Sequence, residues 1–227
     1  MDFYRVMVSF GKRKLFACGC LAEMINYNRT SCPSCGIEWA MPDHNKLFND
    51  KSWNMKIYMS RDHYADFIAS DLPGSGIVSE HAKKILMENF NNTIDFGNIE
   101  MISFRNLTDQ KLKEIRDDFG YAAVKKIPND PPQYYRMLLK QGADLDFEKS
   151  NIKLILDCHK CGRKNYDRPR DTGTSSNIYI IESTWKYYDL FHVEGKGNTI
   201  FCSERFIDIY DQNKLTGLEF EKVQTVR

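Results

Sequence analysis

The sequence predicts an α+β fold with mixed or antiparallel sheets and a few helices, whose N- and C-terminal segments are joined by a four-cysteine zinc site. Most of the ordered segments have the composition of short strands, and only a few have the periodicity of helices. Strands and helices alternate without a regular βαβ rhythm, which favours α+β over α/β. The third observation is a Cys-x-x-Cys-Gly motif that occurs twice, far apart in the chain.

Short segments rich in β-branched and aromatic residues, bounded by polar or glycine-containing stretches, predict the strands. They are FYRVMV (3–8), MKIYM (55–59), IEMISF (99–104), IKLILD (152–157), NIYII (177–181) and YDLFHV (188–193), with weaker signals at IFCS (200–203) and LEFEKV (218–223).

Apolar residues at helical spacing predict helices over residues 79–90, 108–119 and 203–213. Ser79 and Thr108 can cap the first two helices, because a hydroxyl oxygen at that position accepts a hydrogen bond from a free backbone N–H. A shorter helix is predicted over residues 62–68.

The proline-rich segment KKIPNDPPQ (125–133) is the best candidate for a boundary in the chain. It divides the sequence into an N-terminal and central α+β region, residues 1–127, and a C-terminal α+β region, residues 128–227. Each region carries one Cys-x-x-Cys-Gly motif. The 227 residues, 42% hydrophobic, can bury the core of one large domain or of two small ones.

The composition indicates a soluble, cytoplasmic protein. No apolar run is long enough to span a bilayer, and the first residues lack the order of a signal peptide. The 32 Lys and Arg residues nearly balance the 31 Asp and Glu residues, so the net charge does not indicate nucleic acid as a partner. Seven cysteines in a chain of this size disfavour a disulfide framework and favour metal binding or reactivity.

The two motifs, with Cys32 and Cys35 in the first and Cys158 and Cys161 in the second, predict one structural zinc site with four thiolate ligands. The glycine behind each pair can adopt a left-handed conformation, which lets backbone N–H groups point at the sulfurs. Four thiolates leave no open position for a water, so the zinc is expected to be structural rather than catalytic.

Other uses of these cysteines remain open. Cys18 and Cys20 could join the first pair in a local site, which would leave the second pair unexplained. The pairs could also be unmetallated thiols or redox dithiols, although neither pair begins a helix in a βαβ unit, where redox pairs usually lie. Cys202 has the setting of a small buried hydrophobe at the end of a strand.

The remaining motifs carry little chemistry. The tripeptide at 171–173 is that of aspartic proteases, but it occurs once and follows polar residues rather than an apolar strand, so a solvated loop is the better interpretation. The Gly-Ser-Gly at 74–76 lacks the lysine of a phosphate-binding loop. The five histidines form no pair with metal-ligand spacing. No catalytic residues are predicted.

The sequence resembles the double-CXXCG motif family, bacterial proteins regarded as immunity proteins of polymorphic or contact-delivered toxin systems. Three stretches carry the resemblance: FYRVMV at the start, CPSCGIEWAMP (32–42), and the end of the chain from CHKCGRKNYDRP (158–169) to the final LEFEKV. The family's paired cysteines correspond to Cys32, Cys35, Cys158 and Cys161. Residues 50–150 match only loosely, and specificity is expected to vary there.

This resemblance implies a protein that binds and neutralises a cognate toxin by tight association and catalyses no reaction of its own. The alternative from another class is a zinc-containing nucleic-acid-binding or regulatory protein. It would need a basic face built from Lys12–Lys14 and from Arg163, Lys164, Arg168 and Arg170.

Overall fold

The computed structural model describes residues 1–8, 16–24, 30–36, 38–39, 55–69, 76–90, 93–103, 108–119, 130–167, 177–196 and 199–227. The helices in this part of the chain are α1 (Glu80–Phe90), α2 (Asp109–Phe119), α3 (Glu204–Gln212) and the 3-10 helix η4 (Glu182–Thr184). The strands are β1 (Phe3–Val8), β2 (Gly19–Met24), β3 (Thr30–Ser31), β4 (Glu38–Trp39), β5 (Met55–Met59), β6 (Phe67–Ile68), β7 (Ile77–Ser79), β8 (Ile94–Met101), β9 (Tyr134–Leu139), β10 (Gln141–Leu145), β11 (Lys153–Asp157), β12 (Lys164–Asp167), β13 (Tyr179–Ile181), β14 (Leu190–Val193), β15 (Ile200–Ser203), β16 (Leu218–Lys222) and β17 (Gln224–Val226).

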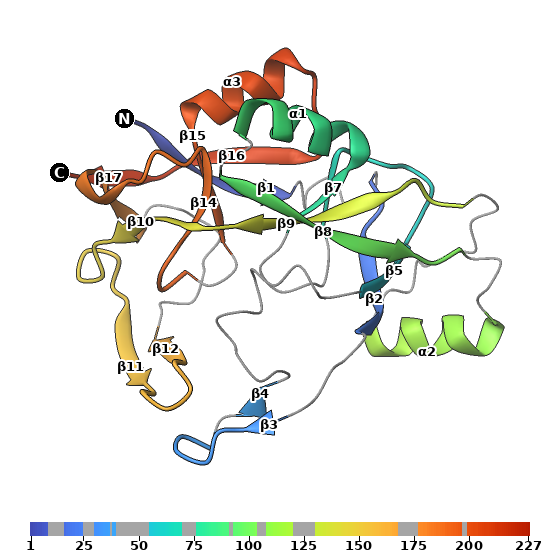
Figure 1. The fold of residues 1–227 in the computed structure, drawn as a ribbon, viewed down its shortest axis with the longest axis horizontal. Helices are drawn as coiled ribbons and strands as arrows, with labels where there is room; N and C mark the ends of the chain where they lie inside the picture. The colour runs from blue at the N-terminus through green and yellow to red at the C-terminus, as the bar shows by residue number, and fades with distance from the viewer. Residues whose placement is uncertain are drawn as a thin grey trace.

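Two mixed sheets form the body of the protein (Figure 1). One has seven strands in the order β16-β1-β15-β14-β10-β13-β17, and the other has six in the order β2-β5-β8-β9-β7-β6. Most neighbours are antiparallel, and the parallel pairs are β10 with β14, β13 with β17, and β5 with β8. Two small hairpins, β3–β4 and β11–β12, complete the described strands.

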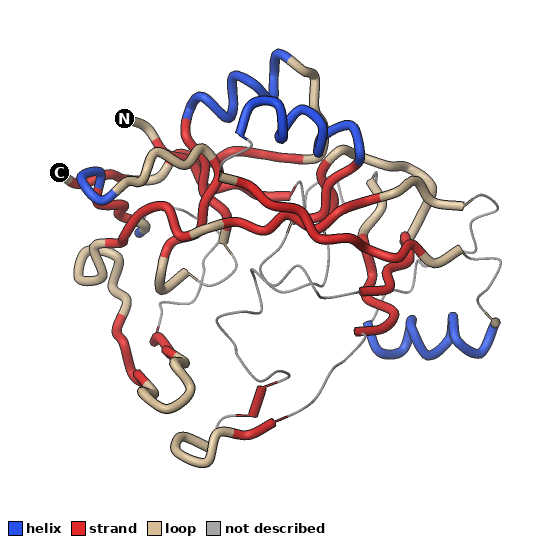
Figure 2. Tube along the Cα trace, viewed as in Figure 1, coloured by secondary structure: helices blue, strands red, loops and turns tan. Residues whose placement is uncertain are grey.

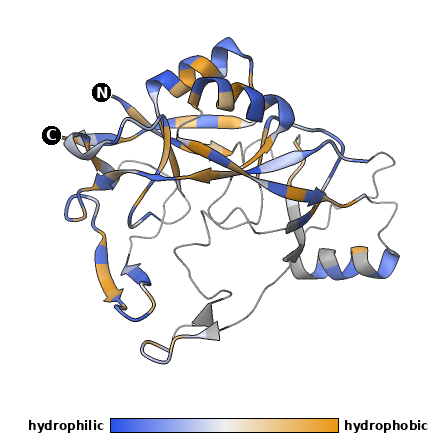
Figure 3. Ribbon diagram, in the orientation of Figure 1, coloured by the Kyte–Doolittle hydropathy of each residue, from blue (hydrophilic) through white to orange (hydrophobic). Residues whose placement is uncertain are grey.

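Helices α1 and α3 lie side by side over the sheets (Figure 1), and their apolar faces share one core. Ala82, Leu86 and Phe90 of α1 contact the same cluster as Phe206 and Tyr210 of α3. Figure 3 shows hydrophobic segments on the strands beneath these helices. The sheets are therefore joined by a common apolar layer rather than only by their connections.

The predicted class is confirmed in part, because the described chain is richer in strand than the term α+β suggests (Figure 2). All eight predicted strands overlap observed ones, and β1, β5 and β15 have the predicted bounds. The strands that sequence reasoning missed include β2, β10 and β12, which contain no β-branched residue. They are extended because they have partners in a sheet, and this context outweighs local propensity.

The three longer helices are confirmed, and the predicted cap of the first, Ser79, is observed. Ser79 Oγ accepts a hydrogen bond of 3.1 Å from the backbone N–H of Ala82, and Ser203 Oγ accepts from Phe206 N. The helix predicted over residues 62–68 is wrong. There the backbone N–H of Phe67 donates to the carbonyl of Thr216, and β6 pairs with β7, so the segment is held extended by partners distant in sequence.

The division into residues 1–127 and 128–227 stays a prediction, since its boundary begins outside the described residues. Strands from the two sides of it pair with each other. Strand β1 lies between β15 and β16, and β9 lies between β8 and β7. Within the described ranges, no helix is long and apolar enough to cross a membrane.

Candidate metal centre

Each Cys-x-x-Cys-Gly motif forms the tip of a small β-hairpin, which we call a knuckle. Residues 32–36 connect β3 to β4, and residues 158–162 connect β11 to β12. In both, the glycine N–H donates to the carbonyl of the first cysteine, at 2.8 Å for Gly36 and 2.7 Å for Gly162. Both glycines have positive φ, 66° and 69°, which confirms the predicted left-handed turns.

The two knuckles meet in space although 126 positions separate their equivalent cysteines. The Sγ atoms of the two first cysteines, Cys32 and Cys158, lie 3.8 Å apart. Those of the two second cysteines, Cys35 and Cys161, lie 3.9 Å apart. All four Sγ atoms lie within 4.8 Å of one another, so the predicted set of four is brought together (the hairpin tips are close in Figure 1).

These separations fit one ion in a tetrahedron of sulfurs. With metal–sulfur bonds of about 2.3 Å, the edge of a regular tetrahedron is about 3.8 Å. A disulfide would need about 2.05 Å between two sulfurs, and none of these four cysteines is in a disulfide. Cys32 and Cys158 are buried, whereas Cys35 and Cys161 are partly exposed. The group is therefore positioned to hold a metal ion, with one side toward the solvent.

The electrostatics of the group favour a cation. A hydrogen bond from the backbone N–H of Cys161 is the main reason why the pKa of Cys158 falls to about 6. Burial opposes ionisation of Cys32, but the N–H groups of Cys35 and Ser34 donate to its sulfur and lower its pKa. Burial raises the pKa of Cys161 to about 12. Backbone hydrogen bonds thus favour the ionised form of Cys32 and Cys158 but do not ionise all four cysteines. The positive charge of a divalent ion would stabilise the remaining thiolates.

The hairpin that carries the second knuckle is tied to the body by contacts that sequence reasoning missed. Lys164 Nζ donates to Glu194 Oε1 at 2.8 Å, and the Tyr166 hydroxyl donates to the same carboxylate oxygen. The Tyr166 ring also lies 5.5 Å from the ring of Phe147, in an edge-to-face contact. Nothing in the sequence near Glu194 indicates its partners, because they precede it by about 30 residues and belong to another hairpin.

The other cysteines lie elsewhere. Cys18 is buried, its N–H donates to Ser60 Oγ, and it is not one of the four clustered sulfurs. Cys20 lies on β2, but its side chain is outside the described residues. Cys202 is fully buried on β15, and burial raises its pKa well above the usual value, which confirms its expected role as a small core residue.

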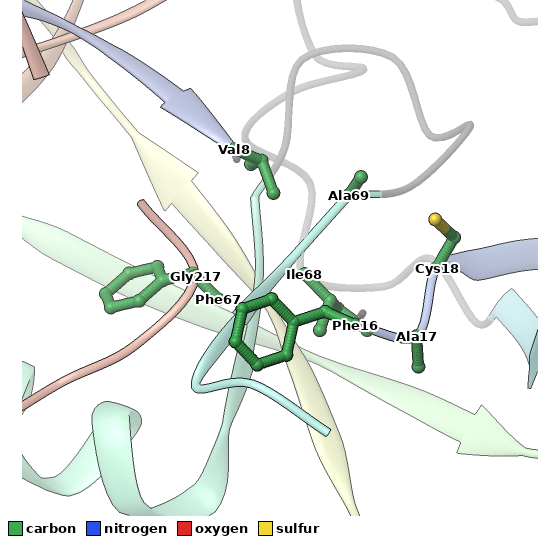
Figure 4. Close-up of a pocket in the computed structure, with 8 residues that line it drawn as sticks. All are labelled: Val8, Phe16, Ala17, Cys18, Phe67, Ile68, Ala69 and Gly217. Atoms are coloured by element: carbon green, nitrogen blue, oxygen red, sulfur yellow. The ribbon is translucent and has the colours of Figure 1, made fainter. Parts of the chain in front are cut away.

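An apolar pocket next to Cys18 is too small for a substrate (Figure 4). Its volume is about 10 Å³, close to the minimum for one water molecule. It is lined by Val8, Phe16, Ala17, Cys18, Phe67, Ile68, Ala69 and Gly217. This pocket is a packing defect between the sheets rather than a reaction site.

The structure gives no support to the other candidate sites considered in the sequence. The tripeptide at 171–173, the basic run 12–14, and Arg168 and Arg170 fall outside the described residues. Among the described histidines, none joins a cluster that could hold a metal. Of the described basic residues near a knuckle, Lys164 is engaged with Glu194.

The C-terminal part of the chain, which carries the second knuckle, is similar to known proteins. Residues 123–225 match the Imm11 immunity protein family. This match confirms the resemblance to immunity proteins, although it does not itself identify the paired cysteine motifs. The Imm11 segment contains Cys158 and Cys161 but not Cys32 and Cys35, so the cluster joins the matched segment to the N-terminal part. No curated protein matches the chain.

The Imm11 segment ends in two elements whose structural roles are clear. In the Ser-Glu-Arg stretch that opens α3, Ser203 Oγ and Arg205 Nη1 each donate at 2.5 Å to the buried Asp189. Arg205 also donates to the carbonyl of Asn89 in α1, at 3.2 Å. In the Leu-Thr-Gly turn, the backbone N–H and the hydroxyl of Thr216 both donate to one carboxylate oxygen of Asp66, at 3.0 and 2.9 Å. Both elements fasten the end of the chain to the body.

Proposed function

We propose that the protein binds a cognate bacterial toxin and neutralises it by tight protein–protein association, with no reaction of its own. The match of residues 123–225 to the Imm11 immunity protein family is the observation that supports this function. An interface of ordinary size, about 1,600 Å² in total, is enough for specific and stable binding. The proposal places the protein in the cytoplasm, where thiols stay reduced and available to a metal.

In this proposal one structural Zn²⁺ is held by Cys32, Cys35, Cys158 and Cys161. A set of four sulfurs at tetrahedral spacing supports zinc, since soft thiolates in this geometry select it over Mg²⁺ or Ca²⁺. The ion would fix the relative position of two hairpins that each have only two strands. An isolated two-stranded hairpin is marginally stable in water, so such a clamp would give both a defined conformation.

The proposed function is tested by expressing candidate toxins, first any encoded by genes adjacent to this one, in cells with and without the protein. Growth should be rescued only with the protein, and the purified pair should form a stoichiometric complex in size-exclusion chromatography. The Cys158→Ser variant should rescue less well, in proportion to the loss of folded protein. A toxin that stays active and unbound in the presence of folded protein would contradict the proposal.

The same purified protein distinguishes the alternative class. A nucleic-acid-binding protein would show an affinity for DNA or RNA that falls steeply with salt concentration, because bound counterions are released. We expect no such binding at physiological salt. Specific binding of DNA or RNA in the absence of toxin binding would favour the alternative.

A further inference from the structure

The four sulfurs of the metal centre divide into a buried pair and a solvent-side pair. Cys32 and Cys158, the first cysteines of the two knuckles, are only 2% and 4% exposed. Cys35 and Cys161, the second cysteines, are partly exposed. Each pair takes one cysteine from each knuckle, and the Sγ atoms within a pair are 3.8 and 3.9 Å apart. The pairs that burial defines therefore run between the knuckles and not within them.

Exposure decides which sulfur a dissolved oxidant meets first. Cysteine oxidation begins at thiolates that the solvent reaches, and it stops at a disulfide where a second thiol lies next to the oxidised one. Cys35 and Cys161 meet both conditions, because both are partly exposed and each has the other 3.9 Å away. A hydroperoxide that arrives from the solvent therefore reacts at one of these two sulfurs and finds the other as the resolving thiol.

Hydrogen bonds within the turns hold the two buried sulfurs in place. The backbone N–H of Ser34 donates to the Cys32 sulfur at 3.4 Å, and the backbone N–H of Cys161 donates to the Cys158 sulfur. A bond within one knuckle would have to draw such a sulfur outward from its turn. A bond between Cys35 and Cys161 leaves both of these hydrogen bonds in place. The turns thus favour oxidation across the knuckles.

We propose that the metal centre is an oxidation site, at which a hydroperoxide joins Cys35 and Cys161 in a disulfide between the two knuckles as the ion is lost. The inference rests on the proposed metal site and is independent of toxin binding. It assigns different roles to the two kinds of cysteine, since the solvent-side pair reacts first and the buried pair stays reduced at this stage.

The reaction with hydrogen peroxide takes two steps. In the first, the thiolate sulfur of one cysteine attacks a peroxide oxygen, so that an S–O bond forms, the O–O bond breaks and the leaving hydroxide takes up a proton to give water. This oxidises the sulfur to a sulfenic acid and reduces the peroxide. In the second, the other thiolate attacks that sulfur, the S–S bond forms, and the S–O bond breaks to release a hydroxide that a second proton converts to water. Two of the four sulfur ligands are then lost, so the tetrahedral site is no longer closed.

The disulfide closes a loop of the same length as the one that the ion closes. Cys35 and Cys161 are 126 positions apart, so either link restrains the unfolded chain over a long loop. The two hairpins, each of only two strands, stay joined although the ion has gone. The centre is thus a clamp with a reduced form that holds a metal and an oxidised form that is covalent.

Peptide mapping of the zinc-loaded wild-type protein tests the proposal. The protein is treated with excess hydrogen peroxide, its free thiols are alkylated, and it is digested with trypsin without reduction. Trypsin cuts after Lys160 and separates Cys158 from Cys161, whereas Cys32 and Cys35 stay in one peptide. We expect the peptide with Cys161 to be linked to this peptide, with fragmentation placing the bond at Cys35. Zinc, followed with a chromogenic chelator, should be released at one ion per disulfide.

Thermal unfolding gives a second readout. A strong chelator should lower the Tm of the reduced protein and should leave the Tm of the oxidised protein unchanged, because the covalent link replaces the ion. The matched control is Cys18→Ser, at a buried cysteine outside the group of four, which should give the same linked peptide as the wild type.

Three results would overturn the proposal. The first is oxidation that gives only disulfides within a knuckle, between Cys32 and Cys35 or between Cys158 and Cys161. The second is oxidation of Cys35 or Cys161 to sulfinic or sulfonic acid with no linked peptide. The third is full retention of zinc by protein that carries the disulfide. Since no toxin takes part in these measurements, each of these results leaves toxin neutralisation to its own test.

Discussion

The sharpest test of the metal centre is the replacement Cys158→Ser, which removes one of two thiols whose sulfurs lie 3.8 Å apart across the knuckles. We expect the metal content to fall from one zinc per chain to none. A hydroxyl is a much poorer ligand than a thiolate for zinc, and the three remaining sulfurs no longer close the tetrahedron. The variant therefore tests whether the second knuckle, and not only the first, is needed to hold the ion.

The cost to stability follows from the length of the loop that the metal closes. The equivalent cysteines of the knuckles are 126 positions apart. If the ion restrains the unfolded chain as a covalent cross-link does, closing a loop of this length is worth about 5 kcal/mol at 25 °C. In a chain of this size, that change in the free energy of unfolding lowers Tm by roughly 10–20 °C.

The assay is elemental analysis of protein purified without a metal-binding tag, together with thermal unfolding followed by circular dichroism. A strong chelator should lower the Tm of the wild type to that of Cys158→Ser and should leave the variant unchanged. The control is Cys18→Ser, at a buried cysteine outside the group of four, which should keep its zinc.

Two results would refute the reasoning. One is a Cys158→Ser variant that retains one zinc. The other is a Cys18→Ser variant that loses its zinc while Cys158→Ser does not, which would place the metal in the N-terminal segment. Iron in place of zinc, visible as a thiolate charge-transfer absorption, would keep the site but correct the identity of the ion.

Three further predictions concern the contacts around the site and the end of the chain. Gly217→Ala should lower the free energy of unfolding, measured in urea, by at least about 3 kcal/mol, because φ is 102° and the new Cβ would lie 2.0 Å from the Phe67 carbonyl oxygen. Gly36→Ala, whose Cβ would have no atom within 4 Å, should cost only about 1–2 kcal/mol. Ser203→Ala should cost about 2–3 kcal/mol, since it removes both the cap of α3 and a donor to a buried carboxylate, and an unchanged urea midpoint would contradict this role. Hydrogen bonds from the Lys164 ammonium and the Tyr166 hydroxyl lower the pKa of Glu194. The ionised Glu194 therefore contributes its full stabilisation of the fold above the ordinary pKa of about 4.5, and this stabilisation is lost as the pH falls through the lower folded value. The difference in Tm between wild type and Glu194→Gln should accordingly be constant from about pH 5 to 7 and shrink below about pH 4.5.

Local sequence signals predicted much of the secondary structure. Ser79 caps its helix as predicted, because a cap depends on residues three positions away, and Ser203, predicted only as the start of the last helix, caps α3 in the same way. The strands β1, β5 and β15 have the predicted bounds, since their β-branched and aromatic residues suit a half-buried surface. The failures are segments such as residues 62–68, whose extended form depends on Thr216 and on β7, far away in the chain.

The clustering of Cys32, Cys35, Cys158 and Cys161 was predictable for a different reason, which is chemical rather than conformational. Metal coordination constrains the chemistry so strongly that residue type, spacing and a following glycine indicate the ligands without knowledge of the fold. The choice of the second pair over Cys18 and Cys20 followed from the spacing, since a local site would leave Cys158 and Cys161 unexplained, and the resemblance agreed with it. The partners of Glu194, Asp189 and Asp66 could not be predicted, because carboxylates are common on any surface and only the tertiary structure shows which ones are engaged.

The position of β1 constrains how the protein is made. This strand lies between β15 and β16, with Phe3 opposite Ser203, so its two neighbours in the sheet are synthesised about 200 residues after it. The cysteines of the first knuckle likewise cannot meet their equivalents until the second knuckle, 126 positions later, has been synthesised. Contacts of such high sequence separation slow folding, and they leave the apolar β1 exposed in nascent chains. The seven-stranded sheet is therefore completed only late in synthesis, and a fragment that ends before β15 lacks both neighbours of β1 although it still carries all four clustered cysteines.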